Sequence, residues 1–227
     1  MSELQATPIQ SERQARLQGI ARKLDWSLSD GDSALLIGYL ALIERWNKVY
    51  NLTAVRDADA MLTLHLADSL AVLAPLRRWM AQRAVQGVVP LQLLDVGSGA
   101  GLPGVVIAIC CPEISVTCID AVGKKAAFIQ QVSVTLKLPN LRAVHGRIEA
   151  LTAMYDVVCS RAFSSLVDFT AWSSNTLAAD GVWLAMKGKI PTEELVALAE
   201  SVQVFHVEPL VVPGLDAERC IVWLRRK

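Results

Sequence analysis

Charged residues are scarce in this sequence, and neither sign predominates. Only 19% of the 227 residues are Asp, Glu, Lys or Arg, and 22 basic residues balance 22 acidic ones. A chain with zero formal net charge lacks the overall positive field that attracts nucleic acid, so an RNA partner would have to bind a local patch. The low charge and the mean hydropathy of +0.38 exclude a disordered chain and are typical of a buried parallel sheet.

Long apolar runs are also missing. No run approaches the roughly 20 residues that cross a bilayer. The first residues, MSELQATPIQSERQ, lack the apolar stretch of a signal peptide. We therefore expect a soluble, cytoplasmic protein without a membrane partner.

Cysteine is infrequent and shows no metal-binding pattern. The number is odd, no CxxC or Cys/His spacing occurs, and each cysteine lies in an apolar segment. We predict no metal site and five reduced core residues: Cys110, Cys111, Cys118, Cys159 and Cys220.

Helical spacing dominates the first part of the chain. Apolar residues recur there every three or four positions, and Ser29, Asp30 and Ser33 are candidate N-caps. The pattern predicts an N-terminal helical extension over residues 1–88, with helices near 10–24, 32–48 and 60–80.

The remainder, 89–227, alternates seven short apolar runs with helical stretches. This alternation predicts βαβ units and a Rossmann-like core with a mostly parallel sheet. The last two runs follow one another across Pro213–Asp216 without a helix, so they should form an antiparallel hairpin at one sheet edge. The intervening helices are expected at 103–111, 123–137, 166–178 and 192–201.

The most informative stretch is Asp95-Val96-Gly97-Ser98-Gly99-Ala100-Gly101-Leu102-Pro103-Gly104, which follows an apolar run and precedes a helix. Glycines such as Gly97, Gly99 and Gly101 let a ligand approach the main chain at the carboxyl ends of the strands. The spacing also satisfies GxGxxG, the pattern of a dinucleotide site. A tight packing turn is the alternative without a ligand.

Two acids help to choose between these ligands. Asp95 precedes the first glycine, where it can accept from the methionine ammonium of S-adenosylmethionine but would face the negative charge of a dinucleotide. Asp120 ends the next strand, where either cofactor places a carboxylate on its ribose; it could also cap the next helix. The acids favour S-adenosylmethionine and leave an NAD(P)-binding oxidoreductase as the alternative.

These motifs resemble those of a known family, the bacterial 16S rRNA (guanine-N7) methyltransferases (RsmG, also called GidB). The resemblance covers roughly residues 35–190. Besides the glycine loop, it rests on Asn47–Ala54, His65–Leu70, Gly123–Lys125, Ser160–Phe163 and Met186–Gly188.

The resemblance implies a class I S-adenosylmethionine-dependent methyltransferase fold and methylation of N7 of a guanine in the decoding-region loop of 16S rRNA. The expected partner is 16S rRNA in a 30S context, and the protein is expected to be a monomer. By position in the family's motifs, Gly97 and Leu102 would contact the cofactor, Ile148 and Glu149 would lie beside its adenine, and Arg161 would end the fourth strand. Methylation of another RNA base or of a small molecule is the alternative reaction.

Three side chains near predicted strand ends are candidate substrate or catalytic groups. Arg161 could pair with Asp95, Asp120 or an RNA phosphate, and we interpret it as both catalytic and cofactor-binding. Phe163 could stack on a flipped base or simply pack. Lys187 could supply positive charge near RNA or be an ordinary solvated residue.

The helical extension adds further candidates for substrate binding. His65 lies near Asp68 and Ser69 on one predicted helix, but no oxyanion hole is indicated, so we interpret it as a substrate contact or cap rather than as part of a triad. Asn51 is a cap or a contact. Arg77 and Arg78, with Arg83, form a basic patch that could bind RNA or be an ordinary surface.

Overall fold

Seven strands form one mixed sheet in the computed structural model, which describes residues 8–84 and 91–227. Strands β1 to β5 pair in parallel, and β7 lies antiparallel between β5 and β6. The predicted fold class is confirmed, with β6 at the edge of the sheet; the expected boundary at residue 88 lies outside the described residues. The spatial order is β3-β2-β1-β4-β5-β7-β6, with β1 (Leu91–Val96), β2 (Ile114–Asp120), β3 (Leu141–His145), β4 (Tyr155–Arg161), β5 (Leu177–Lys187), β6 (Val202–Leu210) and β7 (Arg219–Arg226).

The central strand β1 is buried on both faces. Its side chains alternate between two layers. Leu93 joins a large cluster with the N-terminal helices, whereas Leu94 and Val96 join a smaller cluster beneath α8 (Leu166–Ser173). An almost continuously apolar strand is therefore placed where both faces exclude water.

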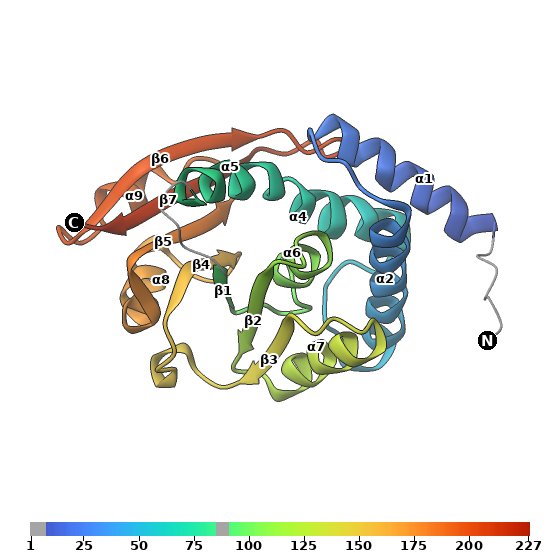
Figure 1. Cartoon of the computed structure of the whole chain (residues 1–227), viewed down its shortest axis with the longest axis horizontal. Helices are drawn as coiled ribbons and strands as arrows, with labels where there is room; N and C mark the ends of the chain where they lie inside the picture. Colours follow the sequence, from blue (N-terminus) through green and yellow to red (C-terminus); the bar gives the residue numbers. More distant parts are fainter. Residues whose placement is uncertain (1–7, 85–90) are drawn as a thin grey trace.

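The N-terminal helices pack alongside the helices of the core. Figure 1 shows α2 (Asp30–Tyr50) beside α6 (Gly104–Cys110) and α7 (Gly123–Thr135), while α1 (Pro8–Lys23) packs on the outer side of α2. Ser29 is the N-cap of α2 and accepts from the Asp32 backbone N–H, as predicted. The two other candidate caps, Asp30 and Ser33, are wrong because both lie inside the helix.

The predicted helix 60–80 is divided into several segments. They are α3 (Ala58–Met61), the π-helix η1 (Leu62–Ala67), α4 (Asp68–Leu70) and α5 (Leu73–Ala84). Together these segments are long and apolar enough on average to pass a test for a membrane-crossing helix, although charged residues interrupt them and no apolar run reaches 20 residues. By length and composition Ala58–Arg83 passes that test, although 78% of its most apolar window is buried inside the protein.

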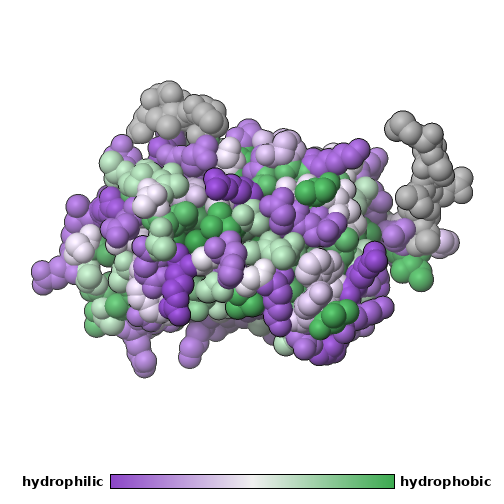
Figure 2. Space-filling model, turned by 90° about the horizontal axis from the view of Figure 1, so that it is seen from below, coloured by the Kyte–Doolittle hydropathy of each residue, from purple (hydrophilic) through white to green (hydrophobic). Residues whose placement is uncertain are grey.

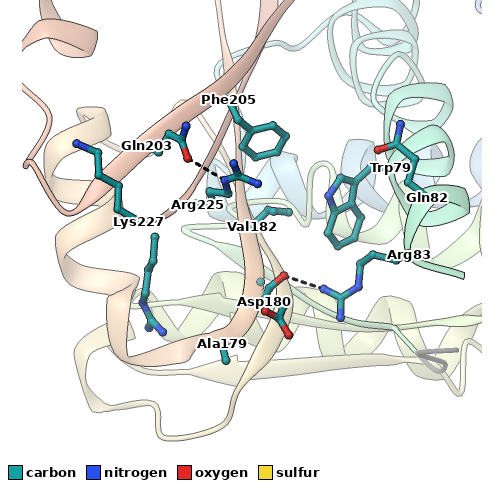
Figure 3. A pocket seen from close by; sticks show the side chains of 12 residues that line it. Trp79, Gln82, Arg83, Ala179, Asp180, Val182, Gln203, Phe205, Arg225 and Lys227 are labelled. Atoms are coloured by element: carbon teal, nitrogen blue, oxygen red, sulfur yellow. Dashed lines mark hydrogen bonds between the residues drawn. The ribbon is translucent and has the colours of Figure 1, made fainter. Parts of the chain in front are cut away.

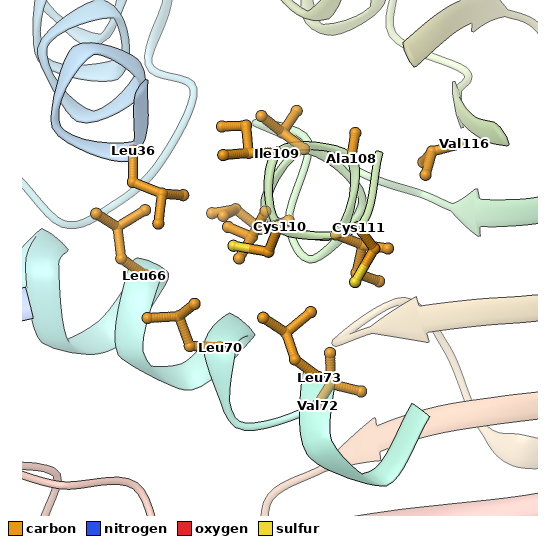
Figure 4. Packing of buried hydrophobic residues seen from close by; sticks show 14 of the residues in the cluster. Leu36, Leu66, Leu70, Val72, Leu73, Ala108, Ile109, Cys110, Cys111 and Val116 are labelled. Atoms are coloured by element: carbon orange, nitrogen blue, oxygen red, sulfur yellow. The ribbon is translucent and has the colours of Figure 1, made fainter. Parts of the chain in front are cut away.

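Helix α6 holds the large cluster together, and each of its seven residues is buried. Figure 4 shows Leu36 of α2, Leu66 of η1, Leu70 of α4 and Leu73 of α5 grouped around it. Each fully buried leucine contributes roughly 1.5–3 kcal/mol, so this cluster fixes the N-terminal helices against the core. The five cysteines are buried and unpaired in the part of the chain that the structure describes, which confirms their assignment to the core. On the outer face seen in Figure 2, hydrophobic residues occur in small groups among hydrophilic ones.

Two predicted helices are too long. Helix α8 ends at Ser173 rather than near 178, a short 3-10 turn follows, and β5 already begins at Leu177. The Ser173 hydroxyl donates to the Phe169 carbonyl and accepts from the Trp183 indole N–H, so it competes with continuation of the helix. Helix α9 (Thr192–Val196) ends well before residue 201.

Asp156 of β4 ties the end of α5 to the start of the sheet. Its Oδ1 accepts from Arg83 Nη2 at 3.0 Å, and its Oδ2 accepts from the Gln92 backbone N–H at 2.9 Å. Both side chains of the ion pair are 15% exposed, so solvent screens this pair only weakly.

Replacing Asp156 by Ala should lower the free energy of unfolding by about 2 kcal/mol, because a hydrogen bond to a charged group contributes about 1.5–3 kcal/mol. Urea denaturation measures the change. Asp216→Ala, which removes an exposed carboxylate, is the matched control and should change stability by less than about 0.5 kcal/mol. Equal losses in the two variants would contradict the role of Asp156.

Candidate functional site

The loop between β1 and α6 is fixed against the carboxyl edge of the sheet. Gly97 and Ser98 donate backbone N–H groups to Ile119 O of β2 at 2.9 and 3.2 Å. From α2, the Tyr39 hydroxyl donates to Ala100 O at 2.5 Å. Open α/β sheets bind ligands at this edge, so the glycine loop lies at the predicted ligand-binding edge.

Gly97 satisfies two constraints that another residue would not. Its φ is +63°, and a Cβ at this position would lie 2.1 Å from Phe163 Cδ2. The Phe163 ring therefore packs on the backbone of the loop. It also meets Trp172 edge to face, with 5.9 Å between the ring centroids.

A cavity of about 170 Å³ opens beside this loop. It brings together five of the predicted site residues, which come from four separate segments: Gly97, Asp120, Ile148, Glu149 and Phe163. Trp172 completes the aromatic wall, and Arg147 adds a cation. The cavity thus combines flat apolar surfaces with carboxylates, as recognition of a nucleoside requires.

Asp120 is buried at the end of β2 and shapes both neighbouring loops. Its Oδ2 accepts from the Gly99 backbone N–H at 2.9 Å, and its Oδ1 accepts from the Val122 N–H at 2.8 Å. Lys125 Nζ lies 3.8 Å from Oδ2. Each carboxylate oxygen has more than one lone pair, so these bonds leave capacity for hydroxyl groups of a ligand.

Asp95 does not line this cavity; it is fully buried beneath the start of α6. Its Oδ2 accepts from the Gly104 backbone N–H at 2.8 Å, whereas Oδ1 has no hydrogen-bond partner among the described residues. Burial raises the pKa of Asp95 to about 7, although the Gly104 bond and the charge of Arg161 oppose the rise. A neighbouring cation would therefore favour its ionised form.

The other predicted loop residues, Gly99, Gly101 and Leu102, lie between β1 and α6 but do not line the cavity. A Cβ on Gly104 would meet Asp95 Oδ2 at 2.8 Å and Cys118 Sγ at 2.5 Å. The close approach of helix and strand thus depends on glycine at this position.

Arg161 also lies outside the cavity, where it binds the N-terminal helical segment. Its Nη1 donates to Asp68 Oδ2 at 2.8 Å and to Leu64 O at 3.1 Å. The second oxygen of Asp68 accepts from Arg219 Nε at 2.8 Å. Of the three partners foreseen for Arg161, Asp95 and Asp120 make no hydrogen bond or ion pair with it in the described residues; Asp68 takes that place.

His65 is buried next to this ion-pair network. Its Nε2 lies 2.8 Å from Thr53 Oγ1, and its Nδ1 has no hydrogen-bond partner within residues 8–84 and 91–227; neither has the Oγ of buried Ser69. Burial and the charge of Arg161 lower the pKa of His65, so the neutral ring is favoured. Unpaired buried polar atoms thus cluster around the end of β4.

Two further candidates have structural partners. Asn51 is the C-cap of α2 with φ +48°, and its Oδ1 accepts from Arg56 Nη2 at 2.9 Å. Lys187 donates to Ser164 O and to Glu194 Oε2, each at 2.8 Å. These bonds hold the two residues in place without engaging the cavity.

The basic patch on α5 is largely neutralised. Arg78 Nη2 lies 2.6 Å from Glu208 Oε2, and Arg77 Nη2 lies 3.6 Å from Glu113 Oε1. Glu113 directly precedes β2, so Arg77 lies at the amino edge of the sheet, opposite the cavity. The structure does not bring Arg77 or Arg78 to the glycine loop.

Several residues of the site have no local signal in the sequence. Trp172 and Tyr39 face the loop only because of how α8 and α2 are rotated, which no local motif encodes. Arg219 reaches Asp68 from a strand 151 residues further along the chain. Arg147 is the exception, because its position shortly after β3 and next to the predicted Ile148 indicates that it belongs to the site.

Comparisons with known proteins relate this chain to methyltransferases. The family model GidB, described as rRNA small subunit methyltransferase G, matches residues 32–222. The ribosomal RNA small subunit methyltransferase G of Polaromonas sp. (strain JS666 / ATCC BAA-500) is 60% identical over 207 residues, covering 91% of this chain and 90% of that protein.

Two solved structures share the fold. TrmN from Thermus thermophilus is 14% identical with a TM-score of 0.53, covering 73% of this chain and 53% of that one. The glycopeptide N-methyltransferase MtfA, complexed with S-adenosyl-L-methionine, is 11% identical with a TM-score of 0.53, covering 65% of this chain and 86% of that one. At such low identity the likeness extends to the fold alone.

The two glycines Gly97 and Gly99 provide a matched pair for a stability test. Both have φ near +60°, but a Cβ on Gly99 would meet only Gly97 O at 4.0 Å, whereas one on Gly97 would strike Phe163. Gly99→Ala should cost about 1–2 kcal/mol from backbone strain. Gly97→Ala should cost about 1–3 kcal/mol more because Phe163 must move. Equal losses on thermal or urea unfolding would show that Phe163 does not pack on the loop in solution.

Asp95 should make stability depend on pH. Below about pH 4 the Asp95 carboxyl is protonated in the folded and in the unfolded protein, and above about pH 7 it is ionised in both. Between these pH values it is ionised only in the unfolded chain. Relative to Asp95→Asn, the wild type should therefore lose stability as the pH rises from 4 to 7. The expected loss is a few kcal/mol, since one pKa unit corresponds to about 1.4 kcal/mol. A difference between the two proteins that is constant with pH would refute the raised pKa.

Proposed function

This chain belongs to the family of ribosomal RNA small subunit methyltransferases G, and from that membership we propose that it transfers the methyl group of S-adenosylmethionine to N7 of a guanine in the decoding-region loop of 16S rRNA. The small-subunit rRNA methyltransferase activity follows from the family. The position N7 and the decoding-region loop rest on the resemblance of the motifs. The proposal is supported by the glycine loop and the adjacent cavity, whose lining suits a nucleoside.

The residues of this edge suit S-adenosylmethionine. Phe163, Trp172 and Ile148 offer flat apolar surface for adenine, and Asp120 can accept from ribose hydroxyls. Asp95 is buried under the same loop without lining the cavity, and its Oδ1, which has no hydrogen-bond partner among the described residues, suits the cationic methionine end. A dinucleotide would place pyrophosphate near these two acids, which disfavours the NAD(P) oxidoreductase alternative.

The chain has mainly to position the reactants. The cofactor supplies the electrophilic methyl group. Guanine N7 presents an unprotonated lone pair, so its attack requires no proton removal and no general base. We assign the orientation of the target to Arg161, held by Asp68 and Leu64 at the end of β4, with Phe163 and His65 as its neighbours.

Cations at the carboxyl edge are better placed for RNA than the patch on α5. Lys124, Arg147 and Lys189 follow the ends of β2, β3 and β5, and all three are exposed. None of them forms an ion pair within the described parts of the chain, so their charge is available to phosphates. We therefore propose that rRNA approaches this edge, with Lys187 and Asn51 supporting the surrounding loops.

The substrate suggests the setting of the reaction. A single chain holds all the residues assigned here, so a monomer suffices. The reaction would take place in the cytoplasm, where 30S subunits assemble.

Mass mapping of 16S rRNA tests the reaction. The purified protein is incubated with S-adenosylmethionine and either small subunits or naked 16S rRNA from cells that lack the chain. The expected product is one 7-methylguanosine in the decoding-region loop. Methylation of another base, or of no RNA, would contradict the proposal. The comparison of small subunits with naked 16S rRNA shows whether the protein acts on assembled or on free rRNA.

The absence of a general base predicts a flat pH profile. At saturating cofactor and RNA, the single-turnover rate should change less than about twofold between pH 6 and 8.5, a range in which a histidine base near its ordinary pKa would titrate. Rapid-quench measurement of methyl transfer checks this. An inflection that disappears in His65→Gln without loss of binding would contradict attack by N7.

A further inference from the structure

A second, larger cavity lies on the other side of the molecule. It has a volume of about 620 Å³ and opens between α5 and the ends of β6 and β7 (Figure 3). A neighbouring cavity of about 300 Å³ shares Trp79, Gln82 and Phe205 with it. The two form one continuous groove, called here the α5 groove.

The α5 groove is remote from the methyl-transfer site. It is bordered by residues 179–182 in the first half of β5, 203–205 at the start of β6 and 225–227 at the end of β7. These positions belong to the amino edge of the parallel strands, whereas the glycine loop lies at the carboxyl edge. Strands of six or seven residues separate the two edges by roughly 20 Å, so nothing in the methyl-transfer chemistry accounts for the α5 groove.

Aromatic rings and guanidinium groups alternate along this groove. Arg83 lies over the Trp79 ring at 5.1 Å from its centroid, and Arg225 lies over the Phe205 ring at 5.4 Å. Figure 3 shows Trp79 and Phe205 turned toward the pocket from α5 and β6, which face each other across it. Phe205 is 37% exposed, so part of its ring is accessible to a ligand in the groove.

Unpaired positive charge continues beyond the rings. Arg225, Arg226 and Lys227 are exposed, and none forms an ion pair with a carboxylate within the described residues. Arg225 Nε donates to Gln203 Oε1 at 3.0 Å, and the amide of Gln82 lines the opposite wall. Aromatic faces for bases, cations for phosphates and amides for base edges are the elements of a single-stranded nucleic acid site.

We propose that the α5 groove binds an unpaired segment of the RNA substrate, separate from the nucleotide that is methylated. The proposal rests on the proposed function for the identity of the RNA. Bases stack on Phe205 and Trp79, while phosphates contact Arg225, Arg226 and Lys227. An RNA held at both edges of the sheet is oriented more tightly than one held at the methyl-transfer site alone, because the second contact is then intramolecular.

Fluorescence anisotropy with a labelled dodecauridylate tests binding in the α5 groove. Phe205→Ala should weaken binding at least about fivefold, and Phe205→Tyr, which keeps the ring, should bind like the wild type. Arg225→Gln combined with Arg226→Gln should weaken binding and reduce its salt dependence. Arg142→Gln, an exposed arginine on β3, is the matched control and should leave both unchanged. Circular dichroism establishes that each variant is folded.

Methyl transfer to small subunits provides the second measurement. Phe205→Ala should raise KM severalfold and leave kcat and S-adenosylmethionine affinity unchanged. The proposal would be overturned if Phe205→Ala had the binding affinity and KM of the wild type. It would also be overturned if Arg142→Gln had effects as large as those of Phe205→Ala. Displacement of the oligonucleotide by AMP at equal concentration would also overturn it, because the groove would then bind mononucleotides. A wild-type chain that methylates no rRNA would refute the proposed function, while dodecauridylate binding would still decide on the groove.

Discussion

The hydrogen bond from the Gly104 backbone N–H to buried Asp95 is the contact on which the rest of the site depends. This bond joins the end of β1 to the first turn of α6, and it requires a residue without a Cβ at position 104. The glycine loop between these two points must then turn tightly enough for Asp120 to accept from Gly99. One oxygen of Asp95 is used in this way, and the other has no hydrogen-bond partner in the part of the chain that the structure describes.

The N-terminal helices complete the site rather than merely precede it. Asp68 accepts from Arg161 of β4 and from Arg219 of β7, so one carboxylate of the N-terminal segment links the two strands that flank β5. Tyr39 reaches the glycine loop from α2 in the same way. The helices and the Rossmann-like core therefore share both a hydrophobic cluster and a polar network, and the ligand edge is made by both.

The sequence was sufficient for features that depend on near neighbours and insufficient for those that depend on distant ones. The mostly parallel sheet with its antiparallel last hairpin, the glycine turn and the acids at the ends of β1 and β2 follow from local patterning and from the rules of parallel sheets. The partner of Arg161 lies 93 residues away and that of Arg78 lies 130 residues away, so neither pairing was visible in the sequence. The early end of α8 reflects a bond from the Trp183 indole in the next strand to Ser173, which helix periodicity does not encode.

The shared hydrophobic cluster has a consequence for biosynthesis. Leu17 and Leu36 are fully buried, but α6, which covers this layer, is translated only about 70–90 residues later. At roughly 5–20 residues per second, the apolar faces of α1 and α2 remain uncovered for several seconds as they leave the ribosome. Trp223 of β7 joins the same cluster and is translated more than 100 residues after α6. The nascent chain thus passes through a period in which these apolar faces are exposed, and this period ends only when the strands of the cluster have been made.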